Sequence, residues 1–208
     1  MMMDDGKTLK DVLGEEDYEL LGKYFKDSLG MGLMLFDRMK PILLSTMMME
    51  KGMEEVVAYE NVFLEMAKEN DMEIKGLETA EFQMSMLDSI PYEVQGKMLM
   101  DGIKQEGGEN EDMFAQMVEL YKQQDIDSLY NITVNESSEF GDYEGPLLVT
   151  RNSNWISVIK EMSTEQPTFF AVGAAHLAGD IGVIQLLKNE GFTTVSYTHL
   201  TLPTIYSV

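Results

Sequence analysis

The sequence predicts a mixed fold of the α+β or α/β type. A small sheet is expected from strands near both ends of the chain, with a large, mostly helical middle region. Two observations lead to this prediction. Apolar residues repeat at helical spacing through most of residues 8–162, whereas residues 168–195 read as strand, helix and strand, an order that can build a parallel sheet. With 208 residues and 44% hydrophobic content, the chain suits one domain, expected over residues 1–195.

The expected helices follow one another through the middle of the chain. Tyr18, Leu21 and Phe25 repeat on one face of the first, and Gly30 is placed to end it. The periodicity and the positions of proline and glycine predict further helices from about Tyr59, and over Thr79–Leu87, Pro91–Lys104, Asp112–Gln123, Leu147–Met162 and Ala178–Asn189.

Three β-prone segments supply the expected sheet. They are Met72–Leu77, Thr168–Val172 and the run that follows Gly191. Residues 196–208 contain no charged side chain, although the chain is otherwise 25% charged, and they resemble a translated sequencing adapter. We therefore expect a non-native tail there and exclude its histidine from functional reasoning.

Charge restricts the classes of partner. The chain has 15 Lys and Arg against 37 Asp and Glu, a formal net charge of −22. Such a surface repels phosphate groups, so nucleic acid is not an expected partner. No apolar run is long enough to span a bilayer, and the absence of cysteine excludes disulfides and thiolate metal sites.

His176 is the first candidate for a chemical role. It ends the turn Gly173–His176, which follows the predicted strand Thr168–Val172. Side chains at the carboxyl end of such a strand point into the crevice where α/β proteins bind ligands. The alternative interpretation is a histidine that caps the helix after it.

Glu78 follows the other predicted strand at a comparable position. If the two strands are neighbours, Glu78 and His176 meet at one sheet edge. A carboxylate beside an imidazole suits a divalent metal with an activated water, or general acid–base catalysis. Alternatively, Glu78 is a residue at a helix N-terminus, where the dipole favours negative charge.

Arg151 is a third candidate, because it lies on a predicted helix of an arginine-poor chain. A guanidinium can bind a carboxylate through two parallel hydrogen bonds. An exposed or carboxylate-paired structural arginine is the alternative.

Several of these segments resemble one known family. The run VGAAHLAGDIGVIQLLKNEGF, which contains Gly173 and His176, resembles the C-terminal signature of the TraB/GumN family, a group that includes Tiki-like metalloproteases. The segment GLETAEFQMSMLDSIPYEVQ around Glu78, AYENVFLEMAKE around Glu60 and RNSNW around Arg151 are similar to it in the same order.

The resemblance implies a metal-dependent hydrolase of peptidase type that acts on a peptide or small-molecule substrate. It implies that His176 and Glu78 are catalytic and bind a divalent metal ion. Glu60, Arg151, Asn152 and Gly173 match further characteristic positions, with substrate-binding or structural roles. An extracytoplasmic location, as a periplasmic, secreted or lipid-anchored protein, is also implied.

One departure from the family pattern affects the expected activity. The family carries an earlier GxxH motif in an N-terminal strand, and we find only the Gly173–His176 one. The resemblance therefore implies an N-terminally truncated chain with an incomplete metal site, which we expect to be inactive. Loss of a strand would expose a sheet edge through which the chain could self-associate.

Two other function classes stay open. A non-catalytic protein could use the same crevice to bind a peptide or haem, with His176 as an axial ligand. A helical interaction protein with a vestigial crevice is the third possibility.

Overall fold

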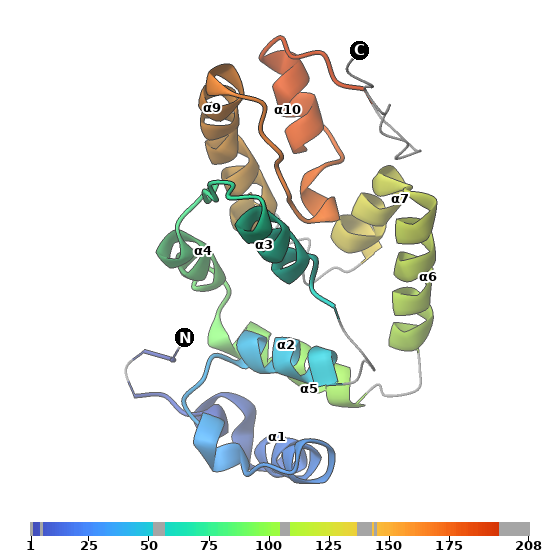
Figure 1. The fold of residues 1–208 in the computed structure, drawn as a ribbon. Helices are drawn as coiled ribbons and strands as arrows, with labels where there is room; N and C mark the ends of the chain where they lie inside the picture. The colour runs from blue at the N-terminus through green and yellow to red at the C-terminus, as the bar shows by residue number, and fades with distance from the viewer. Residues whose placement is uncertain are drawn as a thin grey trace. The chain divides into compact units, whose positions relative to one another are not determined.

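Helices make up the structure, a computed structural model that describes residues 2–4, 6–51, 57–104, 109–136, 143 and 145–195 (Figure 1). Within these ranges no strand and no sheet form, and a single isolated bridge joins Met2 to Met39. The expected α+β or α/β fold is therefore wrong for the described part of the chain, which is mostly helical. With no sheet there, the exposed sheet edge expected to support self-association is also absent from those residues.

Fourteen helical elements follow one another along the described chain. They are α1 (Leu9–Tyr24), η1 (Phe25–Leu29), η2 (Leu33–Phe36), α2 (Pro41–Lys51), α3 (Tyr59–Glu69), α4 (Ala80–Leu87), α5 (Tyr92–Lys104), α6 (Glu109–Gln123), α7 (Ile126–Asn131), η3 (Ile132–Glu136), η4 (Gly145–Val149), α9 (Thr150–Glu165), η5 (Ala174–His176) and α10 (Val183–Asn189). Elements η1, η3 and η4 are π-helical, and η2 and η5 are 3₁₀ turns.

Periodicity located most helices correctly. The helix expected from about Tyr59 begins there, and Gly30 ends the first helical run with a φ of 66°, a left-handed conformation that favours glycine. The last helix is shorter than expected, because α10 begins only at Val183.

The three β-prone segments are not strands, for a shared physical reason. An extended segment becomes a strand only when its backbone N–H and C=O groups pair with a neighbouring segment. The chain is extended at Gln166 (φ −162°, ψ 161°) and at Gly173 (φ −60°, ψ 145°), but residues 167–173 join no ladder. Residues 72–77 and 192–195 likewise have no strand assignment. The tail expected over residues 196–208 lies outside the described residues.

The described chain divides into two compact units, Met1–Phe114 and Ala115–Val208, so that α6 crosses the boundary. The expectation of a single domain over residues 1–195 stays a prediction. No helix among the described residues has the length and apolar character needed to cross a membrane.

Apolar packing of α1, α2 and α5 forms the core of the first unit, where α5 contacts both other helices. Leu9 and Leu21 of α1 and Phe25 of η1 are fully buried in it. The crossing of α1 and α5 is close, because a Cβ on Gly96 would lie 2.9 Å from side-chain atoms of Val12 and Leu13. Nine buried residues make up this core cluster: Met3, Leu9, Leu21, Phe25, Leu33, Leu44, Leu99, Met100 and Ile103.

Two buried polar side chains connect the helices of the first unit. Gln95 is fully buried, and its Nε2 donates to the carbonyl oxygens of Ile90 at 2.8 Å and Leu87 at 3.2 Å. Lys40 is buried and pairs with Asp88. Gln95 thus satisfies backbone carbonyl oxygens at and after the end of α4, and Lys40 is neutralised by a carboxylate, so both have structural roles.

In the second unit, α9 packs against both η4 and α10, and α7 packs against η5. Leu147 and Leu148 of η4 and Trp155 and Ile159 of α9 are its main buried apolar residues. Because His176 lies in η5, the packing of α7 against η5 helps to set the position of its imidazole.

Candidate functional site

His176 lies in the 3₁₀ turn η5, directly after residues 167–173, which have no helix or strand assignment. Its backbone N–H donates to the carbonyl oxygen of Gly173 at 3.0 Å, and the residue is only 7% exposed. The helix that follows begins at Val183 with Gly182 at its N-cap, so His176 comes too early in the chain to cap it. The capping alternative is therefore wrong.

Both ring nitrogens of His176 face polar side chains of α9. Nδ1 lies 2.6 Å from Oδ1 of Asn152, and Nε2 lies 3.2 Å from Nη1 of Arg151. Asn152 is 1% exposed, so its contact with the imidazole is shielded from water. A buried side chain-to-side chain hydrogen bond of this kind is a minority type in proteins.

An aromatic ring completes the cluster. The centroid of Trp155 lies 4.5 Å from that of His176, and the guanidinium carbon of Arg151 lies 4.9 Å from the Trp155 ring centroid. Arg151 and Trp155 are four residues apart on α9 and so share one helix face. The guanidinium therefore contacts an imidazole and an indole at once, with a cation–π contribution from the latter.

The π-helical turn η4 immediately precedes this face of α9. A π turn leaves backbone carbonyls outside the usual α-helical pattern, and such turns are frequent at functional sites. Arg151 Nη1 donates to the Leu147 carbonyl oxygen at 3.3 Å, and the Thr150 hydroxyl donates to that of Gly145 at 3.1 Å. The wide turn is thus bonded to the residues that begin α9.

Asn152 also binds the loop that follows His176. Asn152 Nδ2 donates to the carbonyl oxygen of Ile181 at 2.9 Å. A Cβ on Gly182 would lie 2.2 Å from the carbonyl oxygen of Ala178, and Gly179 has a φ of 80°. A Cβ on Gly179 would also lie 2.9 Å from the ring of Tyr130 on α7. Glycine at both positions lets the loop fold closely against its surroundings.

Four of the residues expected in the site come together. Arg151, Asn152 and His176 are in direct contact, and a Cβ on Gly173 would lie 3.7 Å from Cδ2 of the imidazole. Glycine at 173 thus leaves space beside the ring, although a small side chain would not overlap it.

Glu60 and Glu78 belong to the first unit. Glu60 is exposed in the first turn of α3, and Glu78 is half-buried just before Thr79, the N-cap of α4. Thr79 Oγ1 accepts from the Phe82 N–H at 3.1 Å, so threonine performs the capping and Glu78 lies outside the helix. The convergence of Glu78 and His176 stays a prediction.

The implied metal can be tested against the donor atoms. Nε2 of His176, the usual ligand atom, faces the Arg151 guanidinium, a cation that would oppose a metal ion at the same place. Nowhere in the described ranges do three or more His, Asp or Glu side chains group closely enough to hold a metal. Since catalytic zinc sites usually have about three protein ligands, the described residues around His176 do not by themselves form a metal site.

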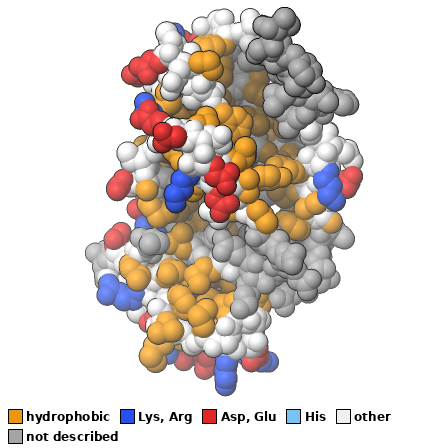
Figure 2. Space-filling model, viewed as in Figure 1, with side chains coloured by type: hydrophobic (Ala, Val, Ile, Leu, Met, Phe, Trp, Pro, Cys, Tyr) orange, Lys and Arg blue, Asp and Glu red, His pale blue; other side chains and the backbone are white. Residues whose placement is uncertain are grey.

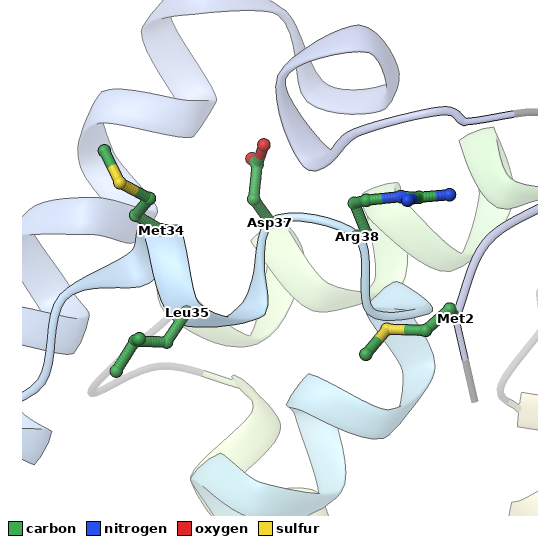
Figure 3. A pocket seen from close by; sticks show the side chains of 5 residues that line it. All are labelled: Met2, Met34, Leu35, Asp37 and Arg38. Atoms are coloured by element: carbon green, nitrogen blue, oxygen red, sulfur yellow. The ribbon is translucent and has the colours of Figure 1, made fainter.

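The first unit has a surface hollow of about 380 Å³, lined by Met2, Met34, Leu35, Asp37 and Arg38 (Figure 3). Met34 is 85% exposed and Leu35 76% exposed, and hydrophobic side chains are visible among charged ones in Figure 2. No histidine or grouped carboxylates line the hollow. Its chemistry gives no reason to place the reaction there.

Two residues were not predicted as site residues, Trp155 in the cluster and Tyr130 beside the loop at Gly179. Trp155 lies within the segment RNSNW, and its spacing of four residues from Arg151 was the available signal. Tyr130 had no such signal, because its role depends on how α7 packs against the loop around Gly179.

Comparison with known proteins supports the family suggested by these segments. The profile described as the TraB/PrgY/gumN family matches residues 1–196, which is nearly the whole chain. No curated protein and no solved structure gives a significant match. The matched residues include α9 and η5, and the chain belongs to the TraB/PrgY/gumN family.

Proposed function

We propose that this chain is a hydrolase of peptidase type whose chemistry is centred on His176. The observation that carries the proposal is the buried imidazole, held at both ring nitrogens by Asn152 and Arg151. A group fixed in position before the substrate arrives is suited to proton transfer, because little reorganisation is needed in the reaction. Hydrolase activity itself comes from what the family resemblance implies.

Glu78 is the second acid–base group in this proposal, and Arg151 is the cation beside the imidazole. We draw no catalytic step through a metal, because the described residues around His176 do not by themselves form a metal site. Dependence on a divalent ion, with His176 and Glu78 as ligands, is therefore an outcome of the test. A peptide is the proposed substrate.

The test is cleavage of a mixture of quenched fluorescent peptides with Mn²⁺, Co²⁺ or Zn²⁺ supplied, or with a chelator. We expect His176→Gln to lower the cleavage rate by about 100-fold or more, the usual contribution of a general acid or base. Glu78→Gln should lower it as well. Asn154→Ala is the matched control, because Asn154 is exposed on the same helix as Asn152.

Cleavage by His176→Gln at the wild-type rate would contradict the proposal. Binding of the same peptides without cleavage, followed by fluorescence anisotropy, would favour the non-catalytic alternative. Haem binding through Nε2 has less support, since the Arg151 guanidinium would have to leave that atom.

The extracytoplasmic location implied by the resemblance is also part of the proposal. Fractionation of the source cells with an antibody against the chain tests it directly. Recovery in the cytoplasmic fraction alone would contradict it.

A further inference from the structure

We propose that Asn152 is a positioning residue that fixes the tautomer of His176, with the proton on Nδ1 and the lone pair on Nε2. In that tautomer Nε2 is the proton-accepting atom of the ring, and its lone pair faces Nη1 of Arg151. The inference rests on the proposed function only in taking His176 as the central group. Its test needs no substrate.

The first step is the orientation of the Asn152 amide. Its nitrogen lies 2.9 Å from the carbonyl oxygen of Ile181, which can only accept a hydrogen bond. The NH₂ group must therefore face Ile181, because the reversed amide would bring two acceptor oxygens together in a buried place. The amide oxygen consequently faces the imidazole.

The second step is the state of the ring. Asn152 Oδ1 only accepts, so Nδ1 of His176, 2.6 Å away, must carry the proton. Arg151 is always a donor, so Nε2, 3.2 Å from Nη1, must present its lone pair. The two contacts are made by different side chains and select the same tautomer.

The third step is the rigidity of the arrangement. The Ile181 carbonyl belongs to a loop that is closed by a hydrogen bond from the Gly182 N–H to the Gly179 carbonyl oxygen at 3.1 Å, and Gly182 lies close against Ala178. Asn152 thus connects α9, the loop and the imidazole through one buried amide. A ring fixed in this way matches the general pattern in which a partner on one nitrogen of a functional histidine sets the orientation of the other.

Two substitutions separate positioning from stability. Asn152→Ala removes the acceptor at Nδ1 and also the donor to Ile181. Asn152→Asp keeps an acceptor at Nδ1 but places its second oxygen against the Ile181 carbonyl, so it should destabilise the protein while retaining the tautomer. Asn154→Ala makes the same substitution at an exposed position of α9.

The experiment is ¹H–¹⁵N NMR of the full chain labelled at histidine, recorded at a pH where free imidazole is neutral. The chain has only two histidines, and His199→Gln assigns the signals of His176. We expect wild-type His176 and the Asn154→Ala variant to show the Nδ1-protonated form alone. In Asn152→Ala the Nε2-protonated form should rise from below detection to a resolved share, and Asn152→Asp should restore the wild-type pattern at a lower melting temperature.

An Nε2-protonated or charged imidazole in the wild-type chain would overturn the proposal, and this result needs no variant to fold. If Asn152→Ala gives the wild-type spectrum, Arg151 alone fixes the tautomer of His176, and the proposal is likewise overturned. If peptide cleavage is absent while the tautomer pattern holds, the proposed function fails and the positioning role stands.

Discussion

Each unit of the molecule buries two polar side chains in its described residues, but the pairs differ in what they bind. In the first unit, Gln95 donates to backbone carbonyl oxygens, and Lys40 pairs with the half-exposed Asp88. In the second, Asn152 and His176 bind each other. Main-chain partners are sufficient explanation for a structural polar group. The Lys40–Asp88 pair reaches a half-exposed carboxylate, whereas the bond between Asn152 and His176 joins two buried side chains, and that separates the candidate site from the packing of the first unit.

The largest expected effect tests whether the first unit depends on apolar burial. Leu21 is fully buried and Leu20 is 38% exposed on the same helix. Leu21→Ala should lower the free energy of unfolding by about 3 kcal/mol, because it removes buried methyl groups and leaves a cavity. Leu20→Ala should cost less than about 1 kcal/mol. Urea denaturation followed by circular dichroism measures both, and equal losses would contradict the described core.

A smaller effect is expected in the loop of the second unit. Gly182→Ala brings a Cβ within 2.2 Å of the Ala178 carbonyl oxygen, so the backbone must move. We expect a loss of about 2 kcal/mol from such overpacking, together with a change in the His176 NMR signals. Gly102→Ala is the control, because nothing lies within 4 Å of its Cβ position on α5, and it should stabilise slightly. An unchanged imidazole signal in Gly182→Ala would show that the loop does not position the ring.

The smallest effect concerns a helix end of the first unit. Asp11 accepts hydrogen bonds from both the hydroxyl and the N–H of Thr8. These bonds lower the pKa of the Asp11 carboxyl, and the bond from the Thr8 hydroxyl has the larger effect. The stabilisation is complete above the pKa that Asp11 has in the unfolded chain, and it is lost as the pH falls through the lower folded pKa. Asp11→Asn should therefore flatten the fall in melting temperature on acidification below about pH 4. An unchanged acid profile would exclude this contribution.

The sequence allowed the helices and part of the candidate site to be predicted. Apolar spacing located α1, α3 and α5, since helix burial follows a period that one segment carries by itself. The β-prone residues 168–172 failed as a strand because pairing depends on a second segment, which no local pattern supplies. His176 and Asn152 were both identified as candidates, but their hydrogen bond joins residues 24 positions apart and follows only from packing of α9 against η5.

The wide turn η4 has a consequence for how this site can vary. Successive residues of an α-helix are rotated by about 100° about its axis, so deleting one residue from Gly145–Val149 would turn the buried Leu147 and Leu148 away from their present side relative to Asn152. The extra residue of the π turn therefore sets the rotation about the helix axis between Leu147 and Leu148 on one side and Arg151 and Asn152 on the other. An insertion or deletion in η4 would therefore change the direction in which Arg151 and Asn152 point, although every residue that contacts the imidazole would be kept.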